Sequence, residues 1–221
     1  MVTAVCKGLI VGAAPAGEAR GMRSGSALAT IGRFAAMAAL ASLLSACSLA
    51  RFSAPDAIFD LSAPEDVGSR AGTSAQLLIP VPAASAALDT ARIAARPTDS
   101  EYAYLPGAVW SDTLPKLLQA RLTETFQNTG RVRAAGRPGQ SLLIHYRVVM
   151  DIRAFEIAGD TAVAEFHVML LNDRNGVVVS RRIVKAAAPL PDRSNAGAVA
   201  ALNGAMDEAF GEIVGWVLRK I

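Results

Sequence analysis

Two neighbouring segments of alternating side chains constrain the fold of this 221-residue chain more than any other feature. Residues 142–150 and 164–170 carry apolar side chains at every even position, whereas their odd positions mix apolar with ionisable residues. Because side chains alternate between the two faces of a β-strand, this pattern predicts antiparallel strands with one covered face. Short connectors, Ala158–Asp160 and Asn172–Gly176, predict hairpins that join these strands to each other and to a third strand over residues 177–189.

Two segments with helical periodicity flank this predicted meander. Residues 111–130 place leucine or phenylalanine at every fourth position from 114, and Gly130 supplies a C-terminal stop. Residues 194–221 form a longer helical segment, which Ser194 or Asn195 can cap at its start. Its predicted buried stripe consists of Val199, Leu202, Met206, Phe210, Ile213 and Val217. We expect both stripes to pack against the covered face of the sheet, because an apolar stripe needs a partner surface.

The residues before the first predicted helix contain shorter strand signals. Residues 58–61 can form an edge strand, and residues 75–82 and 88–97 predict two further strands. Residues 100–110 are expected to be irregular, because Pro106-Gly107 is a turn signal. The predicted order is therefore β-β-β-α-β-β-β-α. This is an α+β fold in which a mixed, largely antiparallel sheet carries two helices packed on one face.

An uncharged apolar run, Phe34–Ala46, lies between Arg33 and Cys47. It is shorter than the roughly 20 residues that a helix needs to cross the hydrocarbon core of a membrane. Positive residues, a short apolar run and small residues at its end form the layout of a secretory signal peptide. The last four residues, Leu44–Cys47, resemble the bacterial lipobox, in which the cysteine is acylated and becomes the first residue of the mature protein.

We therefore predict that residues 1–46 are a lipoprotein signal peptide, with Met22 as an alternative start, and that Cys47 carries a covalent lipid. The competing interpretation is an ordinary apolar helix that contains a cysteine. Ser48, rather than an aspartate, follows the cysteine, and this resembles the sorting state of outer-membrane lipoproteins. Since the only other cysteine, Cys6, lies in the signal peptide, no intramolecular disulfide is expected.

The residues after Cys47 divide into a tether and a domain. Residues 47–74 are mostly small, polar or proline, apart from the apolar patch at 58–61, and predict a flexible periplasmic tether. Residues 75–221 are predicted to form one domain. The net charge of +3 arises before Cys47, where four basic residues face one acidic residue, so the remainder is balanced at 18 of each sign. A nucleic-acid partner is therefore not expected, because it requires a basic stripe on the folded part.

Residues that could carry chemistry are few. His145 and His167 fall on adjacent predicted strands, so a metal site with Glu165 or Asp151 is one interpretation, and a solvated strand face is the favoured one. No zinc-binding, nucleophile-elbow or phosphate-loop motif is present. The pair Asp207-Glu208 is interpreted as solvating charge on a helix surface. We therefore predict no enzymatic activity, no metal and no cofactor other than the lipid on Cys47.

Two sets of side chains are candidates for binding. Tyr102, Tyr104 and Trp110 lie just before the first predicted helix, where they can anchor a partner or close one end of the core. On the last predicted strand, Arg181 and Lys185 fall on one face and Arg182 on the other. That pattern favours an exposed edge over a lipid head-group site.

Taken in order, these motifs resemble one protein family, the ABC-type transport auxiliary lipoproteins (PqiC-like or YmbA-like). The resemblance spans nearly all of the chain after Cys47. It rests on the lipobox and on Phe59-Asp60-Leu61, where family members typically carry Tyr-x-Leu. It also rests on Ala91–Pro97, on Tyr104-Leu105-Pro106-Gly107 with Trp110, on Ile152–Glu156 and on the C-terminal helix.

The resemblance implies a periplasmic domain anchored to the outer membrane. There it would work with an MCE-type (mammalian-cell-entry) substrate-binding protein, an inner-membrane permease and an ATPase that move lipids between membranes. It would contact these partners, with phospholipid and further copies of itself as additional candidates, and would hydrolyse nothing. The competing hypothesis is a cell-envelope biogenesis lipoprotein that binds envelope polymers or assembly machinery.

Overall fold

The computed structural model describes residues 55–65 and 72–221. The predicted signal peptide and Cys47 lie outside the described residues. In chain order, the strands and helices are β1 (Ala57–Phe59), β2 (Gln76–Leu78), β3 (Ala83–Ala84), β4 (Arg92–Thr98), β5 (Glu101–Trp110), α2 (Leu114–Asn128), β6 (Ala134–Gly136), β7 (Tyr146–Ala158), β8 (Thr161–Asn172), β9 (Val178–Pro189) and α3 (Asn195–Leu218).

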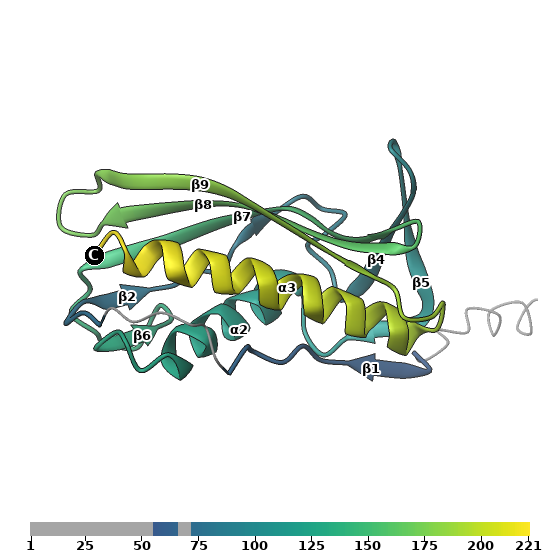
Figure 1. The fold of residues 1–221 in the computed structure, drawn as a ribbon, viewed down its shortest axis with the longest axis horizontal. Helices are drawn as coiled ribbons and strands as arrows, with labels where there is room; N and C mark the ends of the chain where they lie inside the picture. Colours follow the sequence, from purple (N-terminus) through teal and green to yellow (C-terminus); the bar gives the residue numbers. More distant parts are fainter. Residues whose placement is uncertain (1–54, 66–71) are drawn as a thin grey trace, which may run out of the picture. The chain divides into compact units, whose positions relative to one another are not determined.

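The sheet is organised around β7, which pairs with β8 on one side and with β2, β3 and β4 on the other. The long pairings β7–β8, β8–β9 and β4–β5 are antiparallel, as expected for consecutive strands joined by short hairpins. The parallel pairings, which include β1–β5 and β2–β6, cover only a few residues each. The predicted α+β class, with a mixed and mostly antiparallel sheet and two helices, is therefore confirmed (Figure 1).

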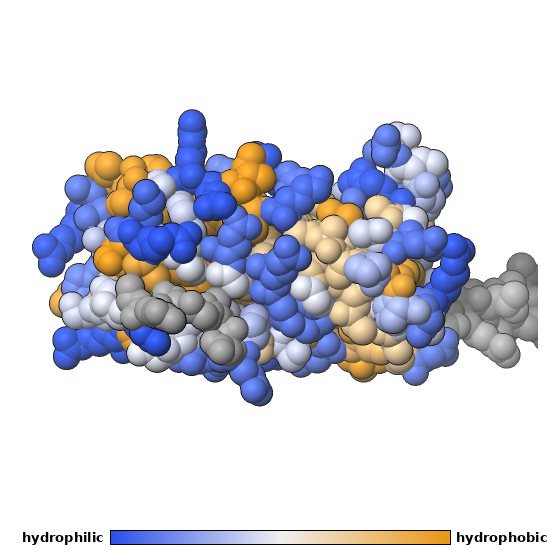
Figure 2. All heavy atoms as spheres, viewed as in Figure 1, coloured by the Kyte–Doolittle hydropathy of each residue, from blue (hydrophilic) through white to orange (hydrophobic). Residues whose placement is uncertain are grey.

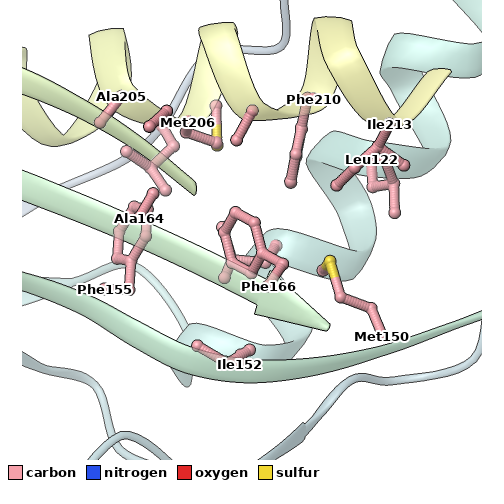
Figure 3. Packing of buried hydrophobic residues seen from close by; sticks show 14 of the residues in the cluster. Leu122, Met150, Ile152, Phe155, Ala164, Phe166, Ala205, Met206, Phe210 and Ile213 are labelled. Atoms are coloured by element: carbon pink, nitrogen blue, oxygen red, sulfur yellow. The ribbon is translucent and has the colours of Figure 1, made fainter. Parts of the chain in front are cut away.

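One face of the sheet is apolar and lies under the helices. Even-numbered side chains of β8, and of β7 up to the register shift after Ile152, point to this face, and Val148, Met150, Ile152, Ala164, Phe166 and Val168 are each at most 5% exposed. Figure 3 shows Phe210 and Ile213 of α3 and Leu122 of α2 directed into the same cluster. The ring centroid of Phe166 lies 5.8 Å from that of Phe210. Burial of these side chains is the main favourable contribution to folding.

The start of α3 follows the predicted capping pattern. Ser194 occupies the N-cap position, and its hydroxyl oxygen accepts a hydrogen bond from the backbone N–H of Gly197 at 3.0 Å. That bond satisfies one of the donors that every helix start leaves free. Helix α2 begins differently, since Thr113 makes no side-chain capping bond and Pro115 lies in the first turn.

The segment predicted to be irregular, residues 100–110, is instead the regular strand β5. The turn signal at Pro106-Gly107 is accommodated as a bulge, because the register shifts between the pairs Arg92–Val109 and Ala94–Tyr104. Gly107 has a φ of +69°, which a residue without a side chain adopts at little cost. Pro106-Gly107 therefore does change the local direction of the backbone, but the strand continues beyond these residues.

Residues 57–61, which lie within the predicted tether, belong to the folded domain. Residues 57–59 form β1, which pairs in parallel with Ala108–Trp110 of β5, and this confirms the suggested edge strand. Leu61 is 3% exposed and belongs to the hydrophobic core. The folded domain consequently includes residues well before the predicted boundary at 75, because residues 57–59 pair with a distant strand and Leu61 is buried in the core.

Candidate functional site

Three segments that the sequence analysis singled out meet at one ionic cluster. It is formed by Arg96 of β4, Tyr102 of β5 and Glu156 of β7. The Nη2 of Arg96 donates a hydrogen bond to Glu156 Oε2 at 3.3 Å, and its Nε donates to Oε1 of the same carboxylate. Nη2 also donates to the hydroxyl oxygen of Tyr102. The guanidinium carbon lies 4.3 Å from the centroid of the Tyr102 ring. The β4–β5 hairpin is thereby fixed to the central strand.

Within the cluster, the charges of Arg96 and Glu156 compensate each other. The side chain of Glu156 is 5% exposed and that of Arg96 is 25% exposed, so the carboxylate is stable there only with its cation. The hydrogen bond to Glu156 raises the pKa of Arg96 above its ordinary value. Burial raises the pKa of Tyr102, and the negative charge of Glu156 adds to that increase. These groups hold one another in place, so the cluster positions the hairpin.

Sequence analysis missed this cluster, since Arg96 and Glu156 are 60 residues apart. One signal could have found it. Glu156 is the only charged residue in the apolar stretch Ala154–Ala158, and a lone carboxylate there calls for a cation on a neighbouring strand.

The three aromatic residues predicted to bind a partner have different environments. Trp110 is 2% exposed and packs on Phe155, with ring centroids 6.1 Å apart, so it closes the core and is not available to a partner. Tyr104 is half-buried, donates a hydrogen bond to the backbone oxygen of Ala87 at 3.2 Å and stacks under Arg92. Partner binding by Tyr102 and Tyr104 stays a prediction.

The Phe59-Asp60-Leu61 motif attaches the N-terminal segment to α2. The backbone oxygen of Phe59 accepts a hydrogen bond from the N–H of Ser111 at 2.8 Å. The carboxylate of Asp60 forms an ion pair with Arg121 at 3.1 Å. A hollow of about 590 Å³ lies beside this junction. Among the described residues, Arg121 is the only cation that lines it, and Arg121 is also paired with Glu124. The motif therefore has a structural role.

The two histidines do not come together. His167 lies opposite Asp151, and its Nδ1 is 3.1 Å from a carboxylate oxygen of that residue. His145 lies near the other end of the strand pair, where its Nδ1 accepts a hydrogen bond from the backbone N–H of Gln76 at 3.1 Å. The expectation that the two could be neighbours is wrong. Across residues 55–65 and 72–221, no group of three or more His, Cys, Asp or Glu side chains could hold a metal ion.

The basic residues of β9 lie on an exposed edge, as predicted, because among the described strands β9 pairs only with β8. Arg182 forms an ion pair with Glu212 of α3, whereas Lys185 pairs with Glu165 of β8. Arg181 lines a hollow of about 400 Å³ on the sheet face away from the helices. The lining residues of that hollow are Arg153, His167, Arg181, Arg182 and Ile183.

Asp207 on α3 is not the solvated carboxylate that the sequence predicted. It is half-buried, and its Oδ1 is buried without a hydrogen-bond partner among residues 55–65 and 72–221, while Oδ2 accepts a hydrogen bond from Asn203 at 3.0 Å. Burial raises the pKa of Asp207, and the bond from Asn203 opposes that shift.

Comparison of the sequence and the fold with known proteins identifies the family of this chain. The family model for the ABC-type transport auxiliary lipoprotein component matches residues 59–214, from the end of β1 to the last turns of α3. The chain therefore belongs to the ABC-type transport auxiliary lipoprotein component family. Over the described residues, no helix has the length and apolar character needed to cross a membrane.

Individual relatives agree with this assignment. An uncharacterized protein of Bradyrhizobium diazoefficiens is 36% identical over 166 residues, which are 74% of this chain and 45% of the relative, so the chain spans less than half of that protein. The crystal structure of protein XCC0632 from Xanthomonas campestris is similar with a TM-score of 0.66 and 26% identity, over 74% of this chain and 95% of that one. A second crystal structure, of an uncharacterized protein, has a TM-score of 0.59 and 12% identity, over 72% of this chain and 97% of that one, and shares the fold.

Proposed function

We propose that this protein is a membrane-anchored periplasmic accessory lipoprotein of an MCE-type ABC lipid transport system. It acts by contact with other proteins between the inner and outer membranes. The single observation that carries this proposal is the family match, which covers residues 59–214. The lipobox at Leu44–Cys47 supports a lipid anchor on Cys47, and Ser48 supports retention in the outer membrane.

The short distance between the anchor and the fold supports a domain held close to the membrane. Nine residues lie between Cys47 and Ala57, where β1 begins, so the two positions are ten residue steps apart. A fully extended chain spans at most about 3.6 Å per residue, so the start of β1 lies within about 36 Å of an acylated Cys47.

The free edge of β9 is the surface on which we expect a partner protein or a second copy of the chain. Val178, Val179 and Ile183 on this strand are 46%, 43% and 52% exposed. Figure 2 shows apolar surface over the start of β9, at the upper left of the view. An unpaired strand edge with exposed apolar side chains offers backbone hydrogen bonds and apolar contact to an added strand.

Purification of the tagged full chain from detergent-solubilised envelopes tests the proposed partnership. Recovery of an MCE-domain protein with a permease and an ATPase is the expected result. Recovery of peptidoglycan or barrel-assembly proteins without any MCE protein would contradict it and would favour the biogenesis hypothesis.

The anchor is tested separately by incorporation of labelled palmitate. Cys47→Ala is expected to abolish incorporation, because no other residue of the predicted mature chain is a cysteine. Cys6→Ala is the matched control and is expected to leave incorporation unchanged. Labelling that survives Cys47→Ala would exclude Cys47 as the anchor.

A further inference from the structure

We propose that the outer face of the β7–β9 sheet binds the phosphate of an anionic phospholipid, in the hollow between Arg153, Arg181 and Ile183. This inference rests on the proposed function for the presence of lipid at the protein and extends it by naming a substrate class. The sequence alone favoured an exposed edge here, and the structure adds a concave cationic site beside that edge.

Strand register places these side chains together. His167 of β8 lies opposite Asp151 of β7 and Ile183 of β9, and the next row along joins Met169 to Arg181. Residues two apart on one strand point to the same face, so Arg181 and Ile183 lie side by side on the edge strand. A register shift between Ile152 and Ala154 puts a bulge at Arg153, and bulges re-aim the side chains that they carry.

The charges around the hollow are not balanced. Arg153 and Lys185 share a single carboxylate, that of Glu165, with N···O distances of 3.7 Å and 3.4 Å. Asp151 is engaged by His167 at 3.1 Å. Within the described part of the chain, Arg181 has no ion-pair partner, and Arg182 at the rim is neutralised by Glu212. Three cations therefore face two carboxylates, and Arg153 and Arg181 retain donors for an anion.

The chemistry of the arginines favours a phosphate as that anion. A guanidinium presents a planar fork of N–H donors that matches the oxygens of a phosphate, and two of them can hold one group from both sides. The distance of 3.7 Å between Arg153 and Glu165 is longer than a hydrogen bond, so this guanidinium can turn toward a ligand without losing one to that carboxylate.

The surroundings of the hollow favour a lipid over a free ion. Ile183 lines the hollow and is 52% exposed. On the same face, half-buried Val149 and Met169 form the neighbouring row. Leu171 and Val178 form the row after it, toward the start of β9, where the β7 position is Arg147, paired with Asp173. An apolar strip along β8 and β9 thus leads away from the cationic site. A phospholipid carries the same sequence of groups, a charged phosphate followed by apolar chains.

Native mass spectrometry of the full chain in neutral detergent tests this proposal. The probes are phosphatidylglycerol, phosphatidylcholine and inorganic phosphate. We expect phosphatidylglycerol to bind and the double variant Arg153→Gln/Arg181→Gln to lower its affinity about tenfold or more, since each change removes a charge-assisted hydrogen bond. The control Arg133→Gln/Arg193→Gln removes the same net charge from exposed arginines elsewhere and is expected to leave the affinity unchanged.

The outcomes separate the sources of the anion and the two proposals. Displacement of the lipid by an equal concentration of inorganic phosphate would overturn the assignment to a lipid. If phosphatidylglycerol bound the Arg153→Gln/Arg181→Gln variant as tightly as the Arg133→Gln/Arg193→Gln control, the proposed lipid site would be overturned. The same result is expected if the natural occupant of the hollow is an acidic protein. Thermal unfolding of both variants at the wild-type temperature shows that the fold is intact. Failure to recover an MCE protein from envelopes leaves this in vitro result unaffected, so the two proposals fail independently.

Discussion

On the sheet formed by β7, β8 and β9, the face toward the helices and the face away from them carry different chemistry. Phe166 on the inner face is 0% exposed and lies between the rings of Phe155 and Phe210. Its neighbour His167 points the other way, toward Asp151 and a cationic hollow. Two adjacent residues of one strand thus differ in role: the side chain of Phe166 stabilises the fold, and that of His167 is available for binding.

The difference teaches that stability and recognition can be changed separately in this domain. The inner face has no ionisable side chain along the central rows of β7 and β8, whereas the outer face has Asp151, Arg153, Glu165 and His167 there. Changes on the inner face are expected to unfold the protein. Most changes on the outer face are expected to leave it folded, and the Arg96–Glu156 pair, which is buried on that side, is the exception.

The largest effect is expected from Phe166→Ala. It removes a fully buried ring and leaves a cavity, so we expect the free energy of unfolding to fall by about 3–5 kcal/mol. Ile183→Ala on the outer face, where the side chain is 52% exposed, is expected to change it by less than about 0.5 kcal/mol. Urea unfolding of both variants measures the comparison, and similar losses in the two would show that the faces do not differ in this way.

A smaller loss is expected from Glu156→Ala, which leaves the partly buried Arg96 without its carboxylate. We expect about 2–4 kcal/mol, less than for a fully buried pair because Arg96 is 25% exposed. Asp160→Ala is the control, since it breaks the pair with Arg193 in which both side chains are more than two-thirds exposed. That change is expected to cost below about 0.5 kcal/mol. Equal values for Glu156 and Asp160 would refute a structural role for the buried cluster.

The smallest effect concerns Asp207, a half-buried carboxylate on α3, the helix that covers the inner face, whose Oδ1 has no hydrogen-bond partner among the described residues. Because the pKa of Asp207 is raised above its ordinary value of 3.8, the folded state holds its proton more tightly than the unfolded state. Stability from this group is therefore present below about pH 3.8 and is lost as pH rises through the folded pKa. Asp207→Asn is expected to stabilise the protein at neutral pH by less than about 1 kcal/mol and to have no such effect at low pH.

Urea unfolding at both pH values measures the Asp207 effect. The matched control is Glu208→Gln on the neighbouring, exposed residue, which is expected to change nothing at either pH. A gain from Asp207→Asn that is the same at both pH values would contradict the assigned cause, since burial of a charge penalises only the ionised form.

Local sequence pattern predicts those parts of this fold in which partners are close in the chain. The alternation over residues 142–170 predicts β7 and β8, because the two strands pair across a short hairpin and one of their faces is uniformly covered. The capping signal at Ser194 predicts the start of α3 for the same reason, since the hydrogen bond spans three residues. In both cases the decisive interaction lies within the window that shows the pattern.

The errors arise where a distant partner decides the structure. The segment around residues 58–61 looks like tether, and its apolar patch suggests only a possible edge strand, because the strand partner lies some 50 residues later, in β5. Residues 101–110 look irregular because Pro106-Gly107 is a turn signal, yet pairing with β1 and β4 extends the strand through a bulge. The hollow at Arg153 and Arg181 forms only when β7, β8 and β9 pair in the observed register, so no short stretch of sequence predicts it.

Lipid movement in living cells tests the proposed role most directly. In a strain that lacks the gene, pulse-labelled phospholipid would be followed between the inner and outer membranes, with wild-type protein, Cys47→Ala, Arg153→Gln/Arg181→Gln or Arg133→Gln/Arg193→Gln supplied in its place. We expect deletion to change the distribution of labelled lipid between the membranes. Wild-type protein and the Arg133/Arg193 control should restore it, and the other two variants should not. An unchanged distribution in the deletion strain would contradict a role in lipid transport.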